Sequence, residues 1–194
     1  MNIAIVKYNA GNIQSLTFAL NRLGITPKVT DDPEELHAAD KVIFPGQGEA
    51  GSAMHYLRAR KLDQVLIDLH QPFLGICLGM QLMCKHLEEG DTPGLGLIDA
   101  TVRKFTADHK VPHIGWNDIS DTRGVLMNEV ADGSFLYFVH SYYVEECPHT
   151  IALCDYGVPF SAAVQKENYY AIQPHPEKSA ESGLKILSNF LNIP

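Results

Sequence analysis

The stretch Phe73-Leu74-Gly75-Ile76-Cys77-Leu78-Gly79-Met80-Gln81 decides the fold. An apolar run leads into a cysteine between two glycines, a pattern typical of a strand that turns sharply into a helix. The serine form of this turn, G-x-S-x-G, presents the nucleophile of many hydrolases. The partial positive charge of a helix N-terminus favours the thiolate form of a thiol. We therefore predict that Cys77 is a nucleophile.

Strand-like and helix-like segments alternate before this turn. The segments at residues 2–8, 26–30 and 41–44 are predicted to be three strands ahead of the strand that ends in the turn. Apolar residues at helical spacing over residues 13–23 and 62–69 predict helices between them. Such alternation implies right-handed crossovers and a sheet covered on both faces. We predict an α/β fold with a mostly parallel, open sheet flanked by helices.

The second half of the chain is rich in short β segments. They lie at residues 97–105, 135–144, 151–155, 160–165 and 169–173, and Asn168 suits a turn between the last two. A closing helix is predicted around residues 184–191. Because neither a repeat nor a long linker divides the chain, residues 1–194 are predicted to form one domain.

Composition narrows the class of protein. The chain has 194 residues and a formal net charge of −8, which argues against nucleic-acid binding because that depends on a basic surface. No apolar run approaches the roughly 18 residues that a membrane span needs. The first residues have no basic region ahead of their apolar run, so we expect a first strand rather than a secretion signal, and a cytoplasmic protein.

The cysteine pattern gives no sign of a disulfide framework or a metal site. Four cysteines are few for a chain of this length, and none forms a C-x-x-C pair. Cys84, Cys147 and Cys154 are expected to be small buried hydrophobic residues. Cys77 and Cys84 are expected on one helix, but no H-x-x-x-H pair supports them as metal ligands. We expect neither a metal nor a cofactor.

The segment Gln173-Pro174-His175-Pro176-Glu177 supplies a candidate base. A residue before proline is disfavoured in the helical region, so the segment should be extended. Residues two apart in an extended chain point to the same side, which would place Glu177 beside His175. The carboxylate would hold one imidazole nitrogen and leave the other free as a base, completing a triad with Cys77.

The turn Pro45-Gly46-Gln47-Gly48 is a candidate oxyanion site. It follows the third predicted strand, and ligand sites of open parallel sheets gather at the carboxyl ends of strands. The turn should therefore face the same crevice as Cys77. Backbone N–H groups of Gly46, Gln47 and Gly48, together with that of Leu78, are expected to hold the oxyanion.

These motifs together resemble the class I (triad-type) glutamine amidotransferases over nearly the whole chain. The generic motifs are the Pro45–Gly48 turn, the Gly75–Gln81 elbow and His175-Pro176-Glu177. Residues 94–98, 111–117 and 137–143 resemble more closely the glutaminase subunits of imidazole glycerol phosphate synthases. The resemblance implies glutamine hydrolysis through a thioester at Cys77. It also implies that the ammonia passes to a (β/α)₈-barrel cyclase. The two subunits would form a heterodimer that acts in histidine biosynthesis.

The resemblance also implies the residues that bind glutamine and the partner. Glu89 would meet the substrate ammonium, while Gln81 and backbone groups at residues 140–142 would hold its carboxylate. The implied glutamine pocket comprises Gly48, Gln81, Glu89, His140, Ser141 and Tyr142. Trp116 is expected to be an interface anchor rather than a buried core aromatic, and Asn12 and Lys178 are further candidates for the partner face.

Three alternatives stay open. One is the glutaminase subunit of another class I enzyme, such as anthranilate or aminodeoxychorismate synthase, although residues 111–117 and the short length argue against it. Another is a free-standing cysteine hydrolase, against which Gln81 and Glu89 count as an amino-acid pocket. The third is a non-catalytic binding subunit, which the presence of Cys77, His175 and Glu177 weakens.

Overall fold

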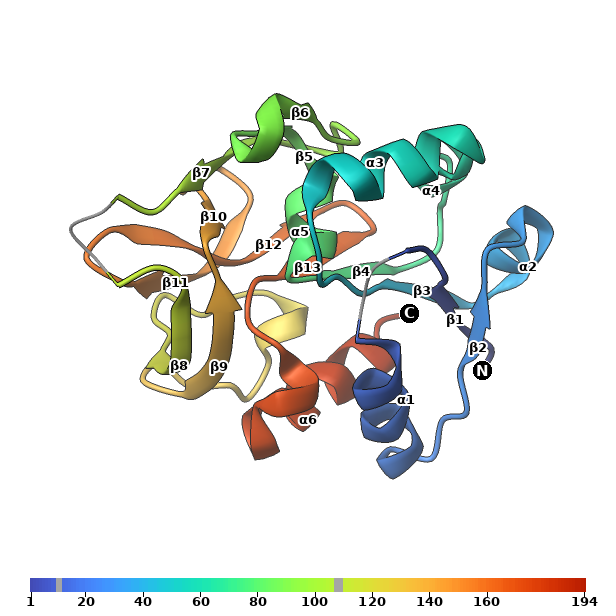
Figure 1. Ribbon diagram of the computed structural model, residues 1–194. Coiled ribbons are helices and arrows are strands. Elements are labelled where there is room, and N and C mark those ends of the chain that lie inside the picture. The colour runs from blue at the N-terminus through green and yellow to red at the C-terminus, as the bar shows by residue number, and fades with distance from the viewer. Residues whose placement is uncertain (10–11, 107–109) are drawn as a thin grey trace.

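The computed structural model describes residues 1–9, 12–106 and 110–194. Its main feature is a seven-stranded sheet in the order β11-β12-β13-β4-β3-β1-β2 (Figure 1). Five neighbouring strands run parallel, namely β2 (Lys28–Thr30), β1 (Ile3–Val6), β3 (Lys41–Phe44), β4 (Phe73–Ile76) and β13 (Tyr169–Ile172). The strands β12 (Pro159–Lys166) and β11 (Thr150–Asp155) extend the sheet in antiparallel fashion. The mostly parallel sheet predicted from the sequence is confirmed.

Helices cover both faces of this sheet. The face that packs against α2 (Pro33–Ala38), α3 (Ala50–Ala59) and α4 (Leu62–Ile67) contains Ala4 and Val6 of β1. The opposite face contains Ile3 and Ile5, and packs against α1 (Ile13–Arg22) and α6 (Ala180–Leu191). In Figure 1, α3 and α4 lie above the sheet, and α1 and α6 lie below it. Because both faces are covered, β1, β3, β4 and β13 are buried at every residue.

The second half adds two small sheets beside the main one. One has the order β10-β7-β5-β6, from Tyr142–Val144, Ile98–Lys104, Cys84–Leu87 and Thr92–Pro93. The other pairs β8 (His113–Asp118) with β9 (Phe135–His140). The sequence predicts one strand over residues 135–144, but the chain leaves the sheet at Ser141 and divides it into β9 and β10. The strand β8 was not predicted, because glycine and polar residues interrupt its apolar pattern.

The short helix after the elbow is a correction to the sequence analysis. Helix α5 spans Leu78–Met83, and Cys84 is the first residue of strand β5. Cys77 and Cys84 therefore do not share a helix. The chain changes direction here because β5 pairs with β7 and β6, and those hydrogen bonds replace further helical turns. Cys84 and Cys154 are buried as expected, whereas Cys147 is only half-buried.

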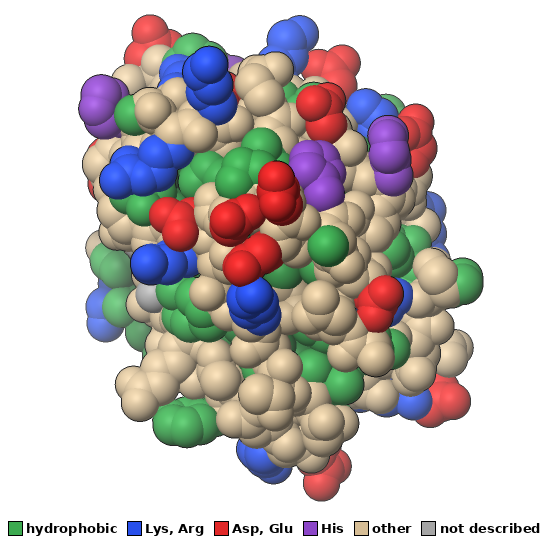
Figure 2. All heavy atoms as spheres, turned by 90° about the vertical axis from the view of Figure 1, so that its right-hand side faces the viewer, with side chains coloured by type: hydrophobic (Ala, Val, Ile, Leu, Met, Phe, Trp, Pro, Cys, Tyr) green, Lys and Arg blue, Asp and Glu red, His purple; other side chains and the backbone are tan. Residues whose placement is uncertain are grey.

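One face of the molecule is mixed in charge. On the face that carries β2 and α2, acidic side chains are interspersed with lysine, arginine and histidine (Figure 2). Within the residues that the structure describes, no helix has the length and apolar character needed to cross a membrane.

Two glycines allow the turn after β3 to pack on the start of α5. A Cβ atom on Gly79 would lie 2.0 Å from the carbonyl oxygen of Phe44, and one on Gly46 would lie 2.4 Å from the backbone nitrogen of Gly79. These contacts are between backbones, so no side-chain rotation relieves them. Only glycine at these positions lets the ends of β3 and β4 lie side by side.

Gly79→Ala should therefore destabilise the fold by about 3 kcal/mol, the upper end of the usual range for an overpacked core. Urea denaturation gives the free energy of unfolding. Gly24→Ala is the matched control, because Gly24 has a φ of +79° but nothing within 4 Å of the place where its methyl group would lie. It should lose only about 1 kcal/mol through backbone strain. Equal losses in the two variants would contradict the close packing at Gly79.

Candidate active site

Cys77 occupies a strained turn at the carboxyl end of β4. Its φ of 53° and ψ of −110° lie outside the regions that non-glycine residues prefer. The turn is fixed on both sides, because the Cys77 N–H donates to the Ile172 carbonyl at 2.8 Å and its carbonyl accepts from the Gln81 N–H at 3.1 Å. The predicted strand–turn–helix elbow is confirmed. Strain of this kind is concentrated at functional sites.

His175 and Glu177 form a buried pair beside the elbow. Nδ1 of His175 lies 2.8 Å from Oε1 of Glu177, and the two side chains are 2% and 3% exposed. The contact was predicted, but the local conformation was not. His175 is extended, whereas Pro176–Lys178 forms a 3₁₀ helix (η3). A 3₁₀ turn, rather than the alternation of an extended chain, brings the carboxylate to the imidazole.

The two neighbours of His175 favour its protonated form. Burial by itself lowers the pKa of this imidazole, but Cys77 and Glu177 outweigh burial and raise it to about 10. Nε2, the second ring nitrogen, has no well-aligned hydrogen bond among the described residues. The imidazole is thus held by the carboxylate at one nitrogen and is close to the thiol, the arrangement of a nucleophile–base–acid triad.

A cavity of about 360 Å³ opens beside Cys77. Its walls combine the elbow, the turn after β3 and the segment that joins β9 to β10. The lining residues are Gln47, Gly48, Cys77, Leu78, Gln81, Glu89, Pro112, Val139, His140, Ser141 and Tyr142. All six residues predicted for the glutamine pocket are among them. Pro112 and Val139 were not singled out, although both lie within the segments 111–117 and 137–143 that carry the family resemblance.

The turn after β3 meets the elbow at this cavity, as predicted. Gln47, Gly48 and Leu78 line it, whereas Gly46 packs against Leu78 and Gly79. Gly48 has a φ of +128°, which is accessible to glycine and strained for other residues. Gly46 therefore fixes the position of the turn, and Gln47, Gly48 and Leu78 border the cavity.

Tyr8 holds the same turn from the other side and was missed by the sequence analysis. Its hydroxyl donates to the Pro45 carbonyl at 2.6 Å. Burial and the nearby Cys77 raise the pKa of Tyr8 well above its usual value, so the hydroxyl keeps its proton. No local sequence signal links Tyr8 to Pro45, because β1 and β3 bring them together only in the folded sheet.

Glu89 and Gln81 line the cavity, and each side chain already makes hydrogen bonds within the protein. Oε2 of Glu89 accepts from the N–H of Ala50, at the start of α3, at 2.9 Å, and burial raises the pKa of Glu89. Nε2 of Gln81 donates to the Tyr142 carbonyl and to Oε1 of Gln173, both at 2.9 Å. The amide of Gln81 therefore fixes the wall of the pocket, and its Oε1 is the atom not used in these two contacts.

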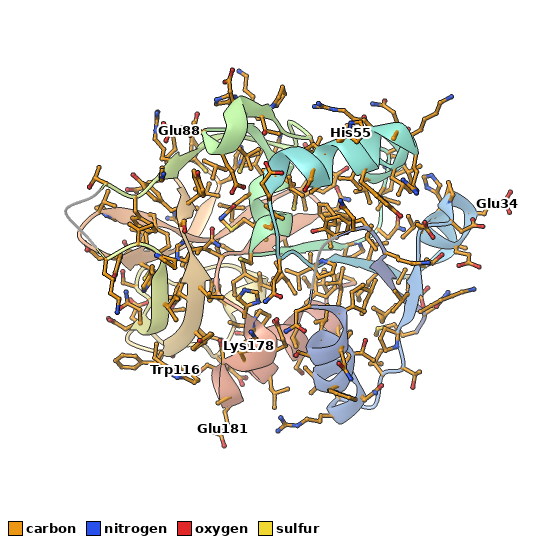
Figure 3. All side chains as sticks on the ribbon, viewed as in Figure 1. Glu34, His55, Glu88, Trp116, Lys178 and Glu181 are labelled. Atoms are coloured by element: carbon orange, nitrogen blue, oxygen red, sulfur yellow. The ribbon has the colours of Figure 1, made fainter. Side chains whose placement is uncertain are left out.

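The three residues predicted for a partner face lie on β8, in η3 and at the start of α1. Trp116 is 51% exposed on β8, and its ring lies 6.0 Å from that of Tyr137 on β9. Nζ of Lys178 lies 5.9 Å from the same tyrosine ring. Asn12 caps α1, which contacts η3. Figure 3 shows Trp116 and Lys178 on the side of the molecule that carries α6.

Trp116 belongs to a larger exposed apolar surface on the β8–β9 ribbon. Ile114 and Phe135 are 59% and 57% exposed. The register pairs Trp116 with Tyr137 and Asp118 with Phe135, so Ile114, Trp116 and Phe135 share one face of the ribbon. Trp116 is not a buried core aromatic.

No cluster of three metal-binding side chains was found among residues 1–9, 12–106 and 110–194.

Comparison with known proteins identifies the family. The class-I glutamine amidotransferase family matches residues 4–193. Two relatives named imidazole glycerol phosphate synthase subunit HisH, from Bacteroides thetaiotaomicron and Escherichia coli strain K12, are 52% and 44% identical over 196 residues. Both alignments cover 100% of this chain and of the relative.

Solved structures show the same fold. A glutamine amidotransferase superimposes with a TM-score of 0.75 at 20% identity, covering 97% of this chain and 96% of the other. The structure of PurLQS from Thermotoga maritima gives 0.74 at 19% identity, covering 98% and 97%. The family match over residues 4–193 and the full-length relatives show that the chain belongs to the class-I glutamine amidotransferases and, within them, to the family of imidazole glycerol phosphate synthase HisH subunits.

Proposed function

We propose that this chain is the glutaminase subunit of an imidazole glycerol phosphate synthase, acting in the cytoplasm in histidine biosynthesis. The full-length relatives that carry this name support the proposal. The observation that carries it is the arrangement around a cavity of about 360 Å³. There Cys77, at its strained elbow, acts on His175, and Nδ1 of His175 lies 2.8 Å from Oε1 of Glu177. A cavity of this size is in the range of small-molecule sites.

The reaction begins with proton transfer from the Cys77 thiol to Nε2 of His175. The thiolate then attacks the side-chain amide carbon of glutamine, and the carbonyl oxygen takes up the negative charge. Backbone N–H groups of Leu78 and of the Gly46-Gln47-Gly48 turn are the proposed donors to this oxyanion. Removing one such donor typically raises the barrier by about 3 kcal/mol.

The raised pKa of His175 explains how the proton is held and then released. While the sulfur is an anion, Cys77 and Glu177 both stabilise the imidazolium. When the C–S bond forms, the sulfur loses its charge and its contribution to that pKa disappears. His175 can then protonate the departing nitrogen, so ammonia leaves and a thioester remains. Water, deprotonated by the neutral imidazole, hydrolyses the thioester to glutamate and restores the thiol.

Carboxylate and amide groups around the cavity suit an amino-acid substrate. Glu89 borders it with one oxygen bonded to Ala50, leaving the other for the substrate ammonium. Residues 140–142 and Gln81, which also line the cavity, are proposed to bind the substrate carboxylate end. Gly48 completes the pocket at the oxyanion turn.

A partner subunit is proposed to receive the ammonia. Ammonia released into water is protonated and is lost as a nucleophile, so a second active site should dock over the first. The proposed partner is a (β/α)₈-barrel cyclase in a heterodimer. The exposed apolar face at Ile114, Trp116 and Phe135, together with Lys178 and Asn12, is the proposed contact surface.

Cys77→Ala should lower glutamine hydrolysis at least about a thousand-fold, because it removes the nucleophile. Glutamate release by the complex with a cyclase measures the loss. Cyclisation driven by added ammonium salts should continue. Cys147→Ala, which removes a half-buried thiol that does not line the cavity, is the control and should keep full activity. Normal hydrolysis by the Cys77 variant would refute the proposed function.

Glu177→Gln should lower the pKa of His175 and reduce kcat for glutamine about a hundred-fold or more, since acid–base catalysis contributes about that much. Titration of the histidine ring signals by NMR follows the first effect, and steady-state kinetics follow the second. Glu181→Gln makes the same change at an exposed position on α6 and should alter neither (Figure 3). An unchanged His175 titration would show that Glu177 does not hold the imidazole.

Trp116→Ala should weaken binding of the cyclase about ten-fold or more, as loss of a buried aromatic anchor does at other interfaces. Isothermal titration gives the dissociation constant. Val29→Ala is the control, because Val29 is also exposed but lies on β2, the edge strand at the far end of the main sheet from β11. If both variants bind as the unmodified chain does, Trp116 is not at the interface.

A further inference from the structure

Gln173 is a fully buried polar residue that the proposed mechanism does not yet use. It follows β13, and its backbone N–H donates to the Ala162 carbonyl at 2.8 Å. Its Nε2 lies 3.6 Å from Sγ of Cys77, and its Oε1 accepts from Nε2 of Gln81 at 2.9 Å. The amide therefore connects the sulfur with the wall of the cavity.

A backbone carbonyl determines which way this amide faces. The Tyr142 oxygen can only accept hydrogen bonds, so the Gln81 atom 2.9 Å from it must be the nitrogen. The second N–H of that nitrogen then needs an acceptor, which is Oε1 of Gln173. Gln173 consequently presents its own N–H to the sulfur. The reverse orientation would place two N–H groups against each other.

Two buried histidines are hydrogen-bonded in series to the same Tyr142 carbonyl. Nδ1 of His140 lies 2.8 Å from the Tyr142 oxygen and must donate to it. Nε2 of His140 is then an acceptor, and Nδ1–H of His113 donates to it at 3.0 Å. Burial lowers the pKa of His113 to about 4 and that of His140 to about 3, so both rings stay neutral at neutral pH. The hydrogen-bond directions are therefore the same over the pH range in which the protein would work.

Without this donor, the hydrogen bond that Sγ makes to a backbone carbonyl would favour the thiol over the thiolate. The Val139 carbonyl lies 3.9 Å from Sγ and accepts from the thiol, so it favours the protonated form. A hydrogen bond to an ionised acceptor is about twice as strong as one between neutral groups. A donor fixed at Sγ therefore favours the thiolate over the thiol and also fixes the direction of its lone pairs.

On the basis of the proposed function, we propose that Gln173 is a further catalytic residue, whose side-chain N–H stabilises and orients the attacking sulfur of Cys77. Gln81 acts as a positioning residue that holds the Gln173 amide in the donating orientation. The contact requires no bond to form or break, and it weakens when the sulfur becomes a neutral thioester.

The test replaces the donor and measures the reactivity of the thiol. Gln173→Met keeps the length and approximate volume of the side chain but has no N–H. Alkylation of Cys77 by iodoacetamide at neutral pH should slow about ten-fold, the usual effect of one charge-assisted hydrogen bond. Mass spectrometry of the Cys77 peptide follows it without interference from Cys147. The far-ultraviolet absorbance of the thiolate should fall, and kcat should fall with little change in KM.

Asn189→Leu is the matched control. Asn189 is also a buried amide, and it donates to the Leu126 and Asn128 carbonyls. None of these three residues lines the cavity beside Cys77. The control variant should lose stability in urea but keep the wild-type alkylation rate. A folded Gln173→Met protein that is alkylated at the wild-type rate would overturn the inference. If that variant does not fold, Gln173→Asn, which withdraws the donor by one methylene, decides by the same measurement.

The alkylation assay needs no glutamine, so it separates the two proposals. A wild-type complex that does not hydrolyse glutamine refutes the proposed function, whatever Gln173 does. An active complex in which the Gln173→Met variant keeps a fully reactive thiol refutes only the role of Gln173.

Discussion

The backbone strain at Cys77 is the constraint on which the rest of the site depends. A φ of 53° costs a non-glycine residue about 1–3 kcal/mol, and it persists only where the surroundings leave no alternative. Here β4 is buried at every residue between β3 and β13, and every residue of α5 is buried as well. Packing before and after the turn prevents the chain from relaxing. The thiol therefore stays at the apex of the turn, and Cys77 lines the cavity.

The order of strands in the sheet brings the other parts to this apex. The strands β3, β4 and β13 are neighbours and parallel, so their carboxyl ends lie at one edge. Each end carries a different function: the turn after β3 borders the cavity, β4 ends at Cys77, and β13 leads to Gln173 and His175. The segments that follow β3, β4 and β13 are short, so these side chains meet although they are distant in sequence. The hydrogen bond from Tyr8 to Pro45 extends this arrangement to β1.

The sequence predicts the parts of the site that short motifs encode. The elbow at Cys77, the turn at Gly46–Gly48 and the pairing of His175 with Glu177 all follow from neighbouring residues. The structure brings them together, although His175 and Glu177 meet through a 3₁₀ turn and Cys84 begins a strand. The parts of the site that the sequence does not reveal are contacts between residues that lie far apart in the chain. Tyr8 belongs to no motif, and Gln173 belongs to the segment of His175 without any sign that its amide reaches the sulfur. Their contacts with Pro45 and Cys77 exist only once the sheet has formed.

The site also shows how two buried imidazoles can differ in charge, with one protonated and the other neutral, according to their neighbours. His175 and His140 are both buried, and burial alone lowers the pKa of each. His175 has a carboxylate and a thiol beside it, and these raise its pKa to about 10. His140 has no carboxylate or thiol as a hydrogen-bond partner in the part of the chain that the structure describes; its ring bonds to the Tyr142 carbonyl and to His113, and burial lowers its pKa to about 3. One ring is thus suited to carry a proton through the reaction, whereas the other is suited to hold a fixed dipole in the pocket wall. A charged His140 could not accept from His113, and the chain of hydrogen bonds that meets at Tyr142 would lose its fixed direction.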